Sequence, residues 1–393
     1  MSLFLCLSGF FSTVAHAYPE QAIPILEESD APIADFGVEE GSLKLPCKSA
    51  VLMEANTGTV LYRQNAEEAL PPASVTKIMT LLLVMEAIDA DTVRLDDTVT
   101  ASANAASMGG SQVYLKEGEQ MTLEDMLKSV VIASANDAAV ALAEHISGSV
   151  TAFVDKMNRR AAELGMTNTT FENVTGLDDS AEHHMTSAMD IALMSRELVK
   201  HRTILQYSSI WMDTIRDGAF GLTNTNRLVR FYSGCTGLKT GSTSKAGFCV
   251  SATAERGEMS LICVIMGAES RDVRNATATQ LLDWGFANYG LYRAEPEQLA
   301  PIEVIGGVQN ECEIATGEFC AVLPKSSLAA VKSKIELPAS IGAPVKAGDV
   351  IGSIVFTVND TPIGSLPIVA TETVNRINFF DVWLRMIARF LLI

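Results

Sequence analysis

The sequence predicts an α+β fold, followed by a small all-β region and a terminal amphipathic helix. An alternation of apolar and polar residues near residue 50 indicates a hairpin, and two apolar strand-like stretches lie at 247–255 and 259–267. Helical periodicity fills most of the chain between the hairpin and these stretches. Because strands lie on both sides of a long helical region, we expect them to meet in one sheet, which is an α+β layout.

The composition is that of a folded protein of more than one domain. The chain has 393 residues, of which 48% are hydrophobic and 19% are charged. That length fits two or three domains, and that composition supports a large buried core. The net charge is −18 and the pI is about 4.7. A nucleic-acid-binding protein needs a basic surface to neutralise phosphates, so we expect no nucleic-acid partner.

Residues 1–17 have the features of a secretory signal. An apolar run follows Met1, and the small-x-small cleavage pattern A-H-A occupies 15–17. The basic segment that usually opens such a signal is missing, so a start upstream of Met1 stays open. A membrane anchor is the alternative, but the apolar run is too short to span a bilayer. We therefore expect export, with residues 18–45, which are rich in Pro, Glu and Asp, as a flexible leader.

The predicted main domain spans residues 46–295 and begins with a hairpin. In "AVLMEANTGTVLYRQN" the turn signal N-T-G at 56–58 separates two alternating stretches. Thr122 and Asp125 form a capping pair at the start of a later helix, and that helix is interrupted near Ser134. The helices that periodicity predicts lie at about 74–88, 121–146, 151–164, 186–201 and 275–290.

The C-terminal part divides into two regions. Residues 296–371 consist of short β-like pieces separated by Gly and Pro, which indicates a small all-β module. Residues 372–393 are amphipathic, with an aromatic and aliphatic surface and one polar stripe formed by Asn378, Asp381, Arg385 and Arg389. Spanning a bilayer would bury those charges, so we expect a helix that lies in the membrane interface with its apolar face down. The alternative is a core helix of the β module.

Seven cysteines are spread along the chain without a C-x-x-C or His-rich spacing. We therefore expect no zinc site, and nothing in the sequence implies another metal or an organic cofactor. Cys249 and Cys263 lie in apolar strand-like stretches, which predicts small buried side chains. Cys312 and Cys320 flank "EIATGEF", and a hairpin disulfide between them is possible in an oxidising compartment.

The stretch "LPPASVTKIMT", residues 70–80, places Ser74 three residues before Lys77 at the start of a predicted helix. Residues three apart share one helix face, so the two side chains can meet. The positive end of the helix dipole favours a negative charge that develops on the serine. Serine needs a base to take its proton, and a lysine can be that base only when it is neutral. Burial and a second nearby cation both lower a lysine pKa.

Two further motifs supply possible partners for this pair. Ser134 and Asn136, in S-A-N, offer a hydroxyl and an amide at the break between two helical stretches. Lys239, Thr240 and Gly241 offer a second cation, another hydroxyl and a glycine that lets a ligand approach the backbone closely. Each motif has an ordinary alternative, a helix N-cap for the first and a solvated strand end for the second. All three motifs in this order predict a nucleophilic active site.

The order S-x-x-K, S-x-N and K-T-G resembles that of the penicillin-recognising serine enzymes. Within that group the chain is similar to the low-molecular-mass penicillin-binding proteins that act as D-alanyl-D-alanine carboxypeptidases, over roughly residues 47–290. Matching stretches include "VIASANDAAVALAE", "TNTNRLV" and "GLKTGSTSKAGFC". The resemblance implies a β-lactamase/transpeptidase-like catalytic domain, in which an antiparallel sheet packs on a helical subdomain. The β module and the amphipathic tail also fit the family's layout.

The resemblance implies a serine hydrolase of peptidoglycan biosynthesis. Its substrate would be a stem pentapeptide that ends in D-Ala-D-Ala, and β-lactam antibiotics would acylate it. Ser74 would be the nucleophile that forms the acyl-enzyme, and Lys77 would be its base. Ser134 would relay protons to the leaving amine, and Asn136 would hold the amide side of the substrate.

The family's remaining roles fall on the K-T-G strand and on one arginine. Lys239 would supply positive potential and help to keep Lys77 neutral, while Thr240 would contact the substrate carboxylate. Arg274 stands where the family commonly has an arginine for that carboxylate, with Arg271 as the alternative.

Two backbone N–H groups would form the oxyanion hole, those of Ser74 and of Ser242, which follows Gly241. Fixed donors of this kind are typically worth about 3 kcal/mol of barrier each. Some members carry histidine directly after K-T-G, and here the residue is Ser242, which leaves the backbone donor in place.

Three other functions compete with this one. A class A β-lactamase needs a glutamate in E-x-x-L-N, which neither Glu163 nor Glu172 provides. A D,D-endopeptidase of peptidoglycan cross-bridges would use the same nucleophile machinery. A penicillin-binding sensor or scaffold would normally carry a signalling part, which is not visible in the sequence. We expect an exported carboxypeptidase held at the outer face of the cytoplasmic membrane by its C-terminal helix.

Overall fold

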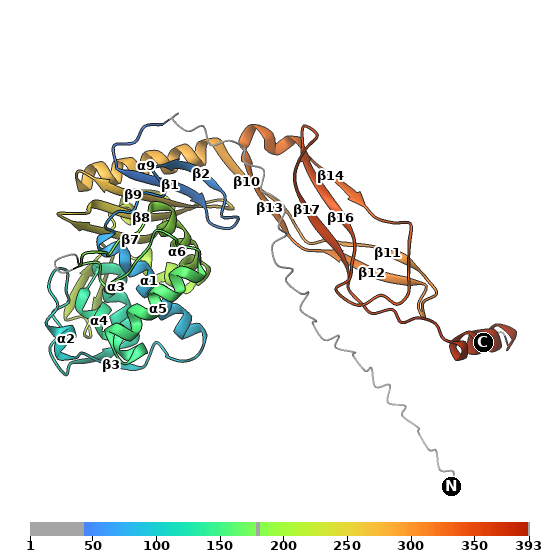
Figure 1. The fold of residues 1–393 in the computed structure, drawn as a ribbon, viewed down its shortest axis with the longest axis horizontal. Coiled ribbons are helices and arrows are strands. Elements are labelled where there is room, and N and C mark those ends of the chain that lie inside the picture. Colours follow the sequence, from blue (N-terminus) through green and yellow to red (C-terminus); the bar gives the residue numbers. More distant parts are fainter. Residues whose placement is uncertain (1–42, 178–180, 392–393) are drawn as a thin grey trace, which may run out of the picture.

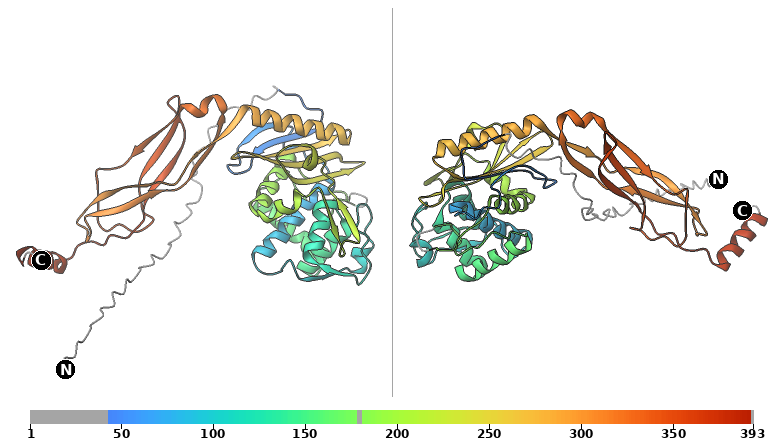
Figure 2. Two further views of the ribbon diagram at one scale, coloured as in Figure 1. Left: turned by 180° about the vertical axis from the view of Figure 1, so that it is seen from behind. Right: turned by 45° about the horizontal axis from the view of Figure 1, so that its top comes forward.

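The structure, a computed structural model, describes residues 43–177 and 181–391. The predicted signal and nearly all of the predicted leader lie outside these residues. The described chain forms a helix-and-sheet domain and an elongated β module beside it, with a short helix at the module's far end (Figures 1 and 2). The prediction of an α+β domain followed by a β module is confirmed.

A five-stranded antiparallel sheet forms the centre of the first domain, in the order β2-β1-β9-β8-β7. The early hairpin joins the late strands because β1 pairs with β9, with Leu52 opposite Cys263. K-T-G lies on the edge strand β7. The strands are β1 Ser49–Glu54, β2 Val60–Gln64, β7 Cys235–Thr243, β8 Gly247–Arg256 and β9 Met259–Ala268.

Helices cover both faces of this sheet (Figure 1). One face packs on α9, Arg271–Asn288, around the buried side chains of Cys263, Leu281 and Leu282. The other face packs on the helical subdomain, whose core joins residues of β1, β9 and most of the helices. That subdomain contains η1 Ala73–Thr76, α1 Lys77–Asp89, α2 Ala103–Ala106, α3 Leu123–Ala133, α4 Asn136–Ser147, α5 Val150–Glu163, α6 Ala188–Lys200, α7 Thr203–Ser208 and α8 Leu228–Phe231.

Side-chain caps fix where several helices begin. Thr122 Oγ1 accepts a hydrogen bond from the N–H of Asp125 at 3.1 Å, as predicted, and Ser149 and Ser187 cap α5 and α6 in the same way. Each cap satisfies a donor that the first turn of a helix leaves open. Two two-stranded antiparallel sheets complete the subdomain, β3 Thr98–Thr100 with β4 Gln120–Thr122 and β5 Met212–Ile215 with β6 Phe220–Thr223.

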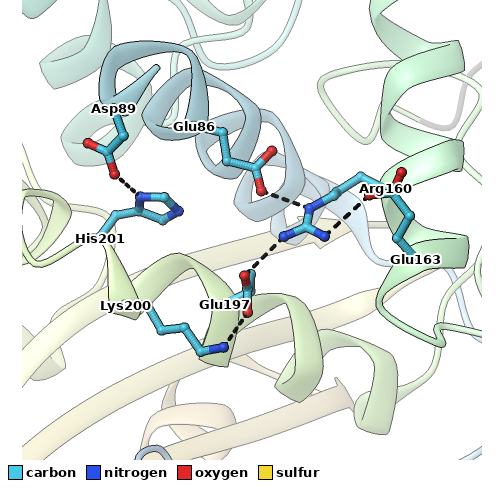
Figure 3. A network of polar contacts seen from close by, with 7 residues as sticks. All are labelled: Glu86, Asp89, Arg160, Glu163, Glu197, Lys200 and His201. Carbon is cyan, nitrogen blue, oxygen red and sulfur yellow. Dashed lines mark hydrogen bonds and ion pairs between the residues drawn. The ribbon is translucent and has the colours of Figure 1, made fainter. Parts of the chain in front are cut away.

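An ionic network ties three helices of the subdomain together (Figure 3). Arg160 of α5 pairs with Glu86 of α1 at 2.7 Å and with Glu197 of α6 at 2.9 Å. Asp89, at the end of α1, lies 2.5 Å from Nδ1 of His201, which follows α6. Because α1 begins at Lys77, these contacts anchor the far end of the helix that carries this lysine.

The β module contains a six-stranded sheet and a separate strand pair, β10 with β13. Its core is apolar and includes Ile314, Phe356 and Ile368. The elements are β10 Tyr289–Ala294, β11 Gln298–Ile305, β12 Glu311–Thr316, β13 Phe319–Pro324, η2 Lys325–Ala330, β14 Val331–Glu336, β15 Ser340–Gly342, β16 Val350–Val358 and β17 Thr361–Ala370.

The proposed pairing of Cys312 with Cys320 is wrong, because both thiols are free. Cys312 is on β12, which pairs with β11 and β17, whereas Cys320 is on β13, which pairs with β10. The two strands are consecutive in sequence but belong to different sheets, so no hairpin brings the sulfurs together. Cys249 and Cys263 are buried, as predicted.

The terminal helix α10, Phe379–Leu391, leaves its apolar side chains in solvent. Phe380 and Phe390 are 71% and 86% exposed, so the alternative of a core helix of the β module is wrong. Asn378 and Asp381 exchange side-chain to backbone hydrogen bonds at 3.0 Å and cap its first turn. Among the described residues, no helix has both the length and the apolar character needed to cross a membrane.

Candidate active site

Ser74 lies in the short 3-10 turn η1, directly before α1, and its side chain is half-buried. The turn is held by a close backbone approach: a Cβ at Gly176, which has a φ of +81°, would lie 1.8 Å from the carbonyl oxygen of Ala73. Only glycine fits at such a position. The sequence predicted a helix from about Ser74, whereas the α-helix begins at Lys77, one 3-10 turn later.

Lys77 meets Ser74, as the three-residue spacing predicted. Its Nζ is fully buried and lies 2.9 Å from Oγ of Ser74, 2.6 Å from Oδ1 of Asn136 and 2.8 Å from the carbonyl oxygen of Thr175. A neutral amine has two hydrogens to donate, and the two carbonyl oxygens accept them. Its lone pair is then left for the hydroxyl of Ser74, which is the arrangement that a general base needs.

The surroundings of Lys77 favour its neutral form. Burial, and after it the charge of Lys239, hold the pKa of Lys77 well below its usual range, while the Asp137 carboxylate acts in the opposite direction. Desolvation disfavours an ammonium ion and a like charge nearby adds to this effect. The amine is therefore suited to take the proton of Ser74.

Ser134 and Asn136 lie at the junction of α3 and α4. Ser134 directly follows the last residue of α3 and caps its C-terminus with a left-handed φ of +62°, and Asn136 is the first residue of α4. Neither side chain acts as an N-cap, so the ordinary alternative for this motif is wrong. Asn136 is held on both sides of its amide: Oδ1 accepts from Lys77, and Nδ2 donates to the carbonyl oxygen of Gly109 at 2.7 Å.

Lys239 joins the S-A-N turn to the edge strand. Its Nζ donates to Oγ of Ser134 at 2.8 Å and to the carbonyl oxygen of Thr240 at 2.9 Å. The side chain is buried in β7, so the alternative of a solvated strand end is wrong. Burial and the charge of Arg274 lower the pKa of Lys239 to about 7.

Thr240 is supported by a segment that motif reasoning did not single out. Its hydroxyl donates to Oγ1 of Thr225 at 2.9 Å. Asn224 and Asn226 hold Thr225 in place, because both are buried and donate to backbone carbonyls on either side, including that of Gly237 at 2.7 Å. The repeated asparagines in "TNTN" were the available signal, since buried amides usually brace backbone.

Arg274 is on α9 and contacts β8, the strand that pairs with the K-T-G strand β7. Its guanidinium is only 3% exposed and donates to the carbonyl oxygen of Cys249 at 3.4 Å and to Oδ1 of Asn275 at 2.9 Å. Cys249 lies opposite Gly241 in the β7–β8 pairing. Burial, and then the charge of Arg271, lower the pKa of Arg274 to about 10. Arg271 itself is exposed, so Arg274 is the arginine built into the site.

Gly241 allows the edge strand to touch the nucleophile's turn. A Cβ at this position would lie 2.7 Å from the backbone nitrogen of Ser74 and 2.9 Å from the carbonyl oxygen of Pro72. The expected close approach is therefore made, within this chain, by its own backbone. Ser242, the second expected oxyanion donor, follows immediately and is exposed.

The assembled groups can perform acyl transfer. Two pairs lie within one region between η1, the α3–α4 junction and β7: the Ser74 hydroxyl with the buried amine of Lys77, and the Ser134 hydroxyl with the buried amine of Lys239. Within residues 43–177 and 181–391, no group of three or more His, Cys, Asp and Glu side chains could hold a metal ion.

Family models match nearly all of the described chain. One that is described as D-alanyl-D-alanine carboxypeptidase covers residues 37–270. A second, described as the C-terminal domain of penicillin-binding protein 5, covers residues 293–376. The first includes all three motifs up to Ser242, and the second coincides with the β module.

Relatives and solved structures agree with these matches. The chain is 43% identical over 351 residues to the D-alanyl-D-alanine carboxypeptidase DacF of Bacillus subtilis, covering 87% of this chain and 90% of the relative. It is 36% identical to DacC of Escherichia coli, over 85% and 86% of the two chains. Penicillin-binding protein 5 of Haemophilus influenzae has a similar structure, with a TM-score of 0.76 at 30% identity over 85% of this chain and 99% of that one.

Part of the similarity extends to a ligand-bound neighbour. The ampicillin-bound form of penicillin-binding protein D2 from Listeria monocytogenes has a TM-score of 0.58 at 32% identity. It covers 63% of this chain and is itself covered completely.

Replacing Gly241 by alanine should disable the site while leaving the domain folded. The added Cβ would displace the backbone at Ser74, and a 1 Å misplacement of a reacting group can cost about a hundredfold in rate. The rate at which fluorescent penicillin acylates Ser74 measures this loss. Gly221→Ala is the matched control, because its Cβ meets no atom within 4 Å. A normal acylation rate in Gly241→Ala would contradict the assigned contact.

Proposed function

This chain belongs to the D-alanyl-D-alanine carboxypeptidase family and is a low-molecular-mass penicillin-binding protein, and from that premise we infer which step each side chain performs. As a serine carboxypeptidase it removes the terminal D-alanine of a peptidoglycan stem peptide through an acyl-enzyme. The observation that carries the assignment of roles is the position of Lys77, whose Nζ lies 2.9 Å from Ser74 Oγ and 2.6 and 2.8 Å from two carbonyl oxygens.

Acylation begins with proton transfer from Ser74 Oγ to the neutral amine of Lys77. The serine oxygen attacks the carbonyl carbon of the penultimate D-alanine, and the resulting oxyanion is bound by the N–H groups of Ser74 and Ser242. The C–N bond then breaks, and Ser134 relays to the departing amine the proton that Lys77 took from Ser74, which leaves Lys77 neutral again. A water molecule releases the acyl group in the second half of the reaction, when Lys77 again acts as the base.

The substrate's C-terminal carboxylate is recognised by the positive end of the site. Lys239 and Arg274 supply two buried positive charges, and the hydroxyl of Thr240 lies at the same end of the strand. Charge of this kind is effective in a water-poor cleft, where screening is weak. A requirement for a free carboxylate beside the scissile bond follows, and the family match favours a carboxypeptidase over a D,D-endopeptidase of cross-bridges.

Acylation by penicillins is part of the same proposal. A β-lactam presents a strained carbonyl and a carboxylate, so it fits the same nucleophile and the same cations. A β-lactamase remains a poor alternative, because Glu163 lies at the end of α5 and pairs with Arg160 at 3.3 Å rather than facing Ser74. The family match also supports a peptidase.

Ser74→Ala is the test of the reaction. D-Alanine release from a pentapeptide that ends in D-Ala-D-Ala should become undetectable, because the acyl acceptor is lost, and penicillin should no longer label the protein. Circular dichroism of the variant checks that it is folded. If penicillin labels the native protein but no D-alanine is released, the protein is an endopeptidase or a sensor and not a carboxypeptidase. Cleavage of a cross-linked dimer of stem peptides distinguishes the endopeptidase from the sensor.

The pH dependence of substrate binding should follow Lys239. This lysine is charged below its pKa of about 7 and neutral above it, so KM for the pentapeptide should rise as the pH passes 7. Removing the charge of Arg274 raises the pKa of Lys239, so in Arg274→Gln the rise should begin at a higher pH. Steady-state kinetics on both sides of pH 7 measure the two profiles. Identical onsets in the two proteins would show that Arg274 does not act on Lys239.

We also propose that the enzyme is exported and works at the outer face of the cytoplasmic membrane, with α10 lying in the interface. The support is the row of exposed apolar side chains on this helix, which includes Phe379, Phe380, Trp383 and Phe390. A soluble protein rarely leaves so much contiguous apolar surface uncovered. The far end of the β module carries α10, so the module would stand between membrane and active site (Figure 2).

The double variant Phe380→Ser, Phe390→Ser should bind phospholipid vesicles at least about tenfold more weakly, because each buried phenyl ring contributes about 1.5–3 kcal/mol. Co-sedimentation with vesicles that contain anionic lipid measures the change. Ile335→Ser removes an exposed apolar side chain of the β module and is the control. Equal binding by all three proteins would rule out α10 as the anchor.

A further inference from the structure

Asp137, which directly follows Asn136, is a buried carboxylate without an assigned role. It is 1% exposed. Its oxygens accept hydrogen bonds from backbone N–H groups, that of Val113 at 3.1 Å, that of Leu115 at 3.0 Å and that of Ala138 at 2.9 Å. Among the ion pairs of the described residues, none includes Asp137. A carboxylate is costly to bury, so its retention here needs a reason.

The hydrogen bonds of Asp137 hold one end of a segment whose other end touches the catalytic amide. The carbonyl oxygen of Gly109 accepts from Nδ2 of Asn136, and that of Ser111 accepts from the N–H of Asn136, both at 2.7 Å. Residues 109–115 are therefore fastened at one end by Asn136 and at the other by Asp137. A Cβ at Gly110, which has a φ of +75°, would lie 2.8 Å from Nδ2 of Asn136, so the segment lies directly on this amide.

The hydrogen bonds from Val113 and Leu115 to Asp137 also fix the backbone conformation of Tyr114. This residue lies between Val113 and Leu115, the two donors to Asp137, and has a left-handed φ of +58°. An aromatic residue rarely adopts that conformation, so the carboxylate holds the segment against its local preference.

The charge of Asp137 also acts on the amine of Lys77, the proposed catalytic base. Asn136 directly precedes Asp137 in the chain, and its Oδ1 is 2.6 Å from Nζ of Lys77. The groups around that amine are Ser74 from η1, Asn136 and Asp137 from α4, Lys239 from β7 and the Thr175 carbonyl from the loop after α5. Of the charged ones, Asp137 is the negative charge and Lys239 the positive one.

We propose that Asp137 is a positioning residue for the acyl transfer, which holds Asn136 against Lys77 through residues 109–115 and keeps one negative charge near the Lys77 amine. The proposal rests on the function proposed above. Burial and the charge of Lys239 favour the neutral form of the amine, but an amine whose pKa is too low is also a poor base. The carboxylate stabilises the ammonium ion that forms when Ser74 gives up its proton.

Asp137→Asn tests the charge, since asparagine has nearly the same shape and retains one acceptor oxygen. The Asp137 charge raises the pKa of Lys77, so its loss should move the acid limb of the kcat/KM profile to lower pH. We expect kcat to fall by about tenfold, because a weaker base transfers the proton less effectively. The alkaline limb should stay where it is, because burial and Arg274, and not Asp137, set the pKa of Lys239.

Asp190→Asn is the matched control. Asp190 is 2% exposed and its carboxylate also clamps a loop, through the N–H of Asn168 at 2.9 Å and the hydroxyl of Thr169 at 2.7 Å. Its substitution should lower the unfolding temperature without moving either limb of the pH profile. A purely structural Asp137 would behave in the same way, so the shift of the acid limb separates positioning from stability.

An unmoved acid limb together with a kcat within twofold of the native value would overturn the proposal. Should Asp137→Asn fail to fold, Asp137→Glu replaces it: the charge is kept, so the acid limb should stay while kcat falls, and a shifted acid limb would refute the charge effect. The pH profile of Ser74 acylation by penicillin gives the same readout without D-alanine release. A failure of the carboxypeptidase assignment therefore leaves this test intact.

Discussion

The site depends on the burial of two lysines in one region. Lys77 and Lys239 are both withdrawn from water, and removing an ammonium ion from water costs several kcal/mol. The two charges also repel each other. Burial and the charge of Lys239 lower the pKa of Lys77 and favour its neutral form, while burial and the charge of Arg274 lower the pKa of Lys239 to about 7, so one amine is suited to act as a base and the other as a cation. The polar groups around the two amines accept their hydrogen bonds, as Asn136 does for Lys77 and Ser134 for Lys239.

The fold brings those acceptors from distant parts of the chain. The nucleophile's turn and the S-A-N junction belong to the helical subdomain, whereas K-T-G lies on the edge strand β7 of the sheet. Close backbone approaches at Gly176 and Gly241 keep the parts in register without side chains between them. On the opposite side of the subdomain, Arg160 joins α1 to α5 and α6, so the helix that begins at Lys77 is fixed at both ends.

The sequence predicted the elements that local chemistry determines. The first hairpin, the Thr122 cap, the break at Ser134 and the meeting of Ser74 with Lys77 all follow from spacing and propensity. The Thr175 carbonyl could not be found, because a backbone acceptor leaves no trace in residue identity. Thr225 and Asp137 were missed because their partners lie on segments that only the tertiary fold brings close. The disulfide prediction failed for a related reason, since consecutive strands of the β module separate into different sheets.

The left-handed backbone at Ser134 limits what this position can become. The proposed proton relay needs a hydroxyl there beside Lys239, and only serine and threonine carry an aliphatic one. Threonine is branched at Cβ, and a branched side chain is poorly tolerated at a φ of +62°. Glycine and asparagine suit that backbone but have no hydroxyl. If Ser134 has the proposed role, chemistry and conformation together leave a single genetically encoded residue for this position, so selection by β-lactams would find no conservative exchange there.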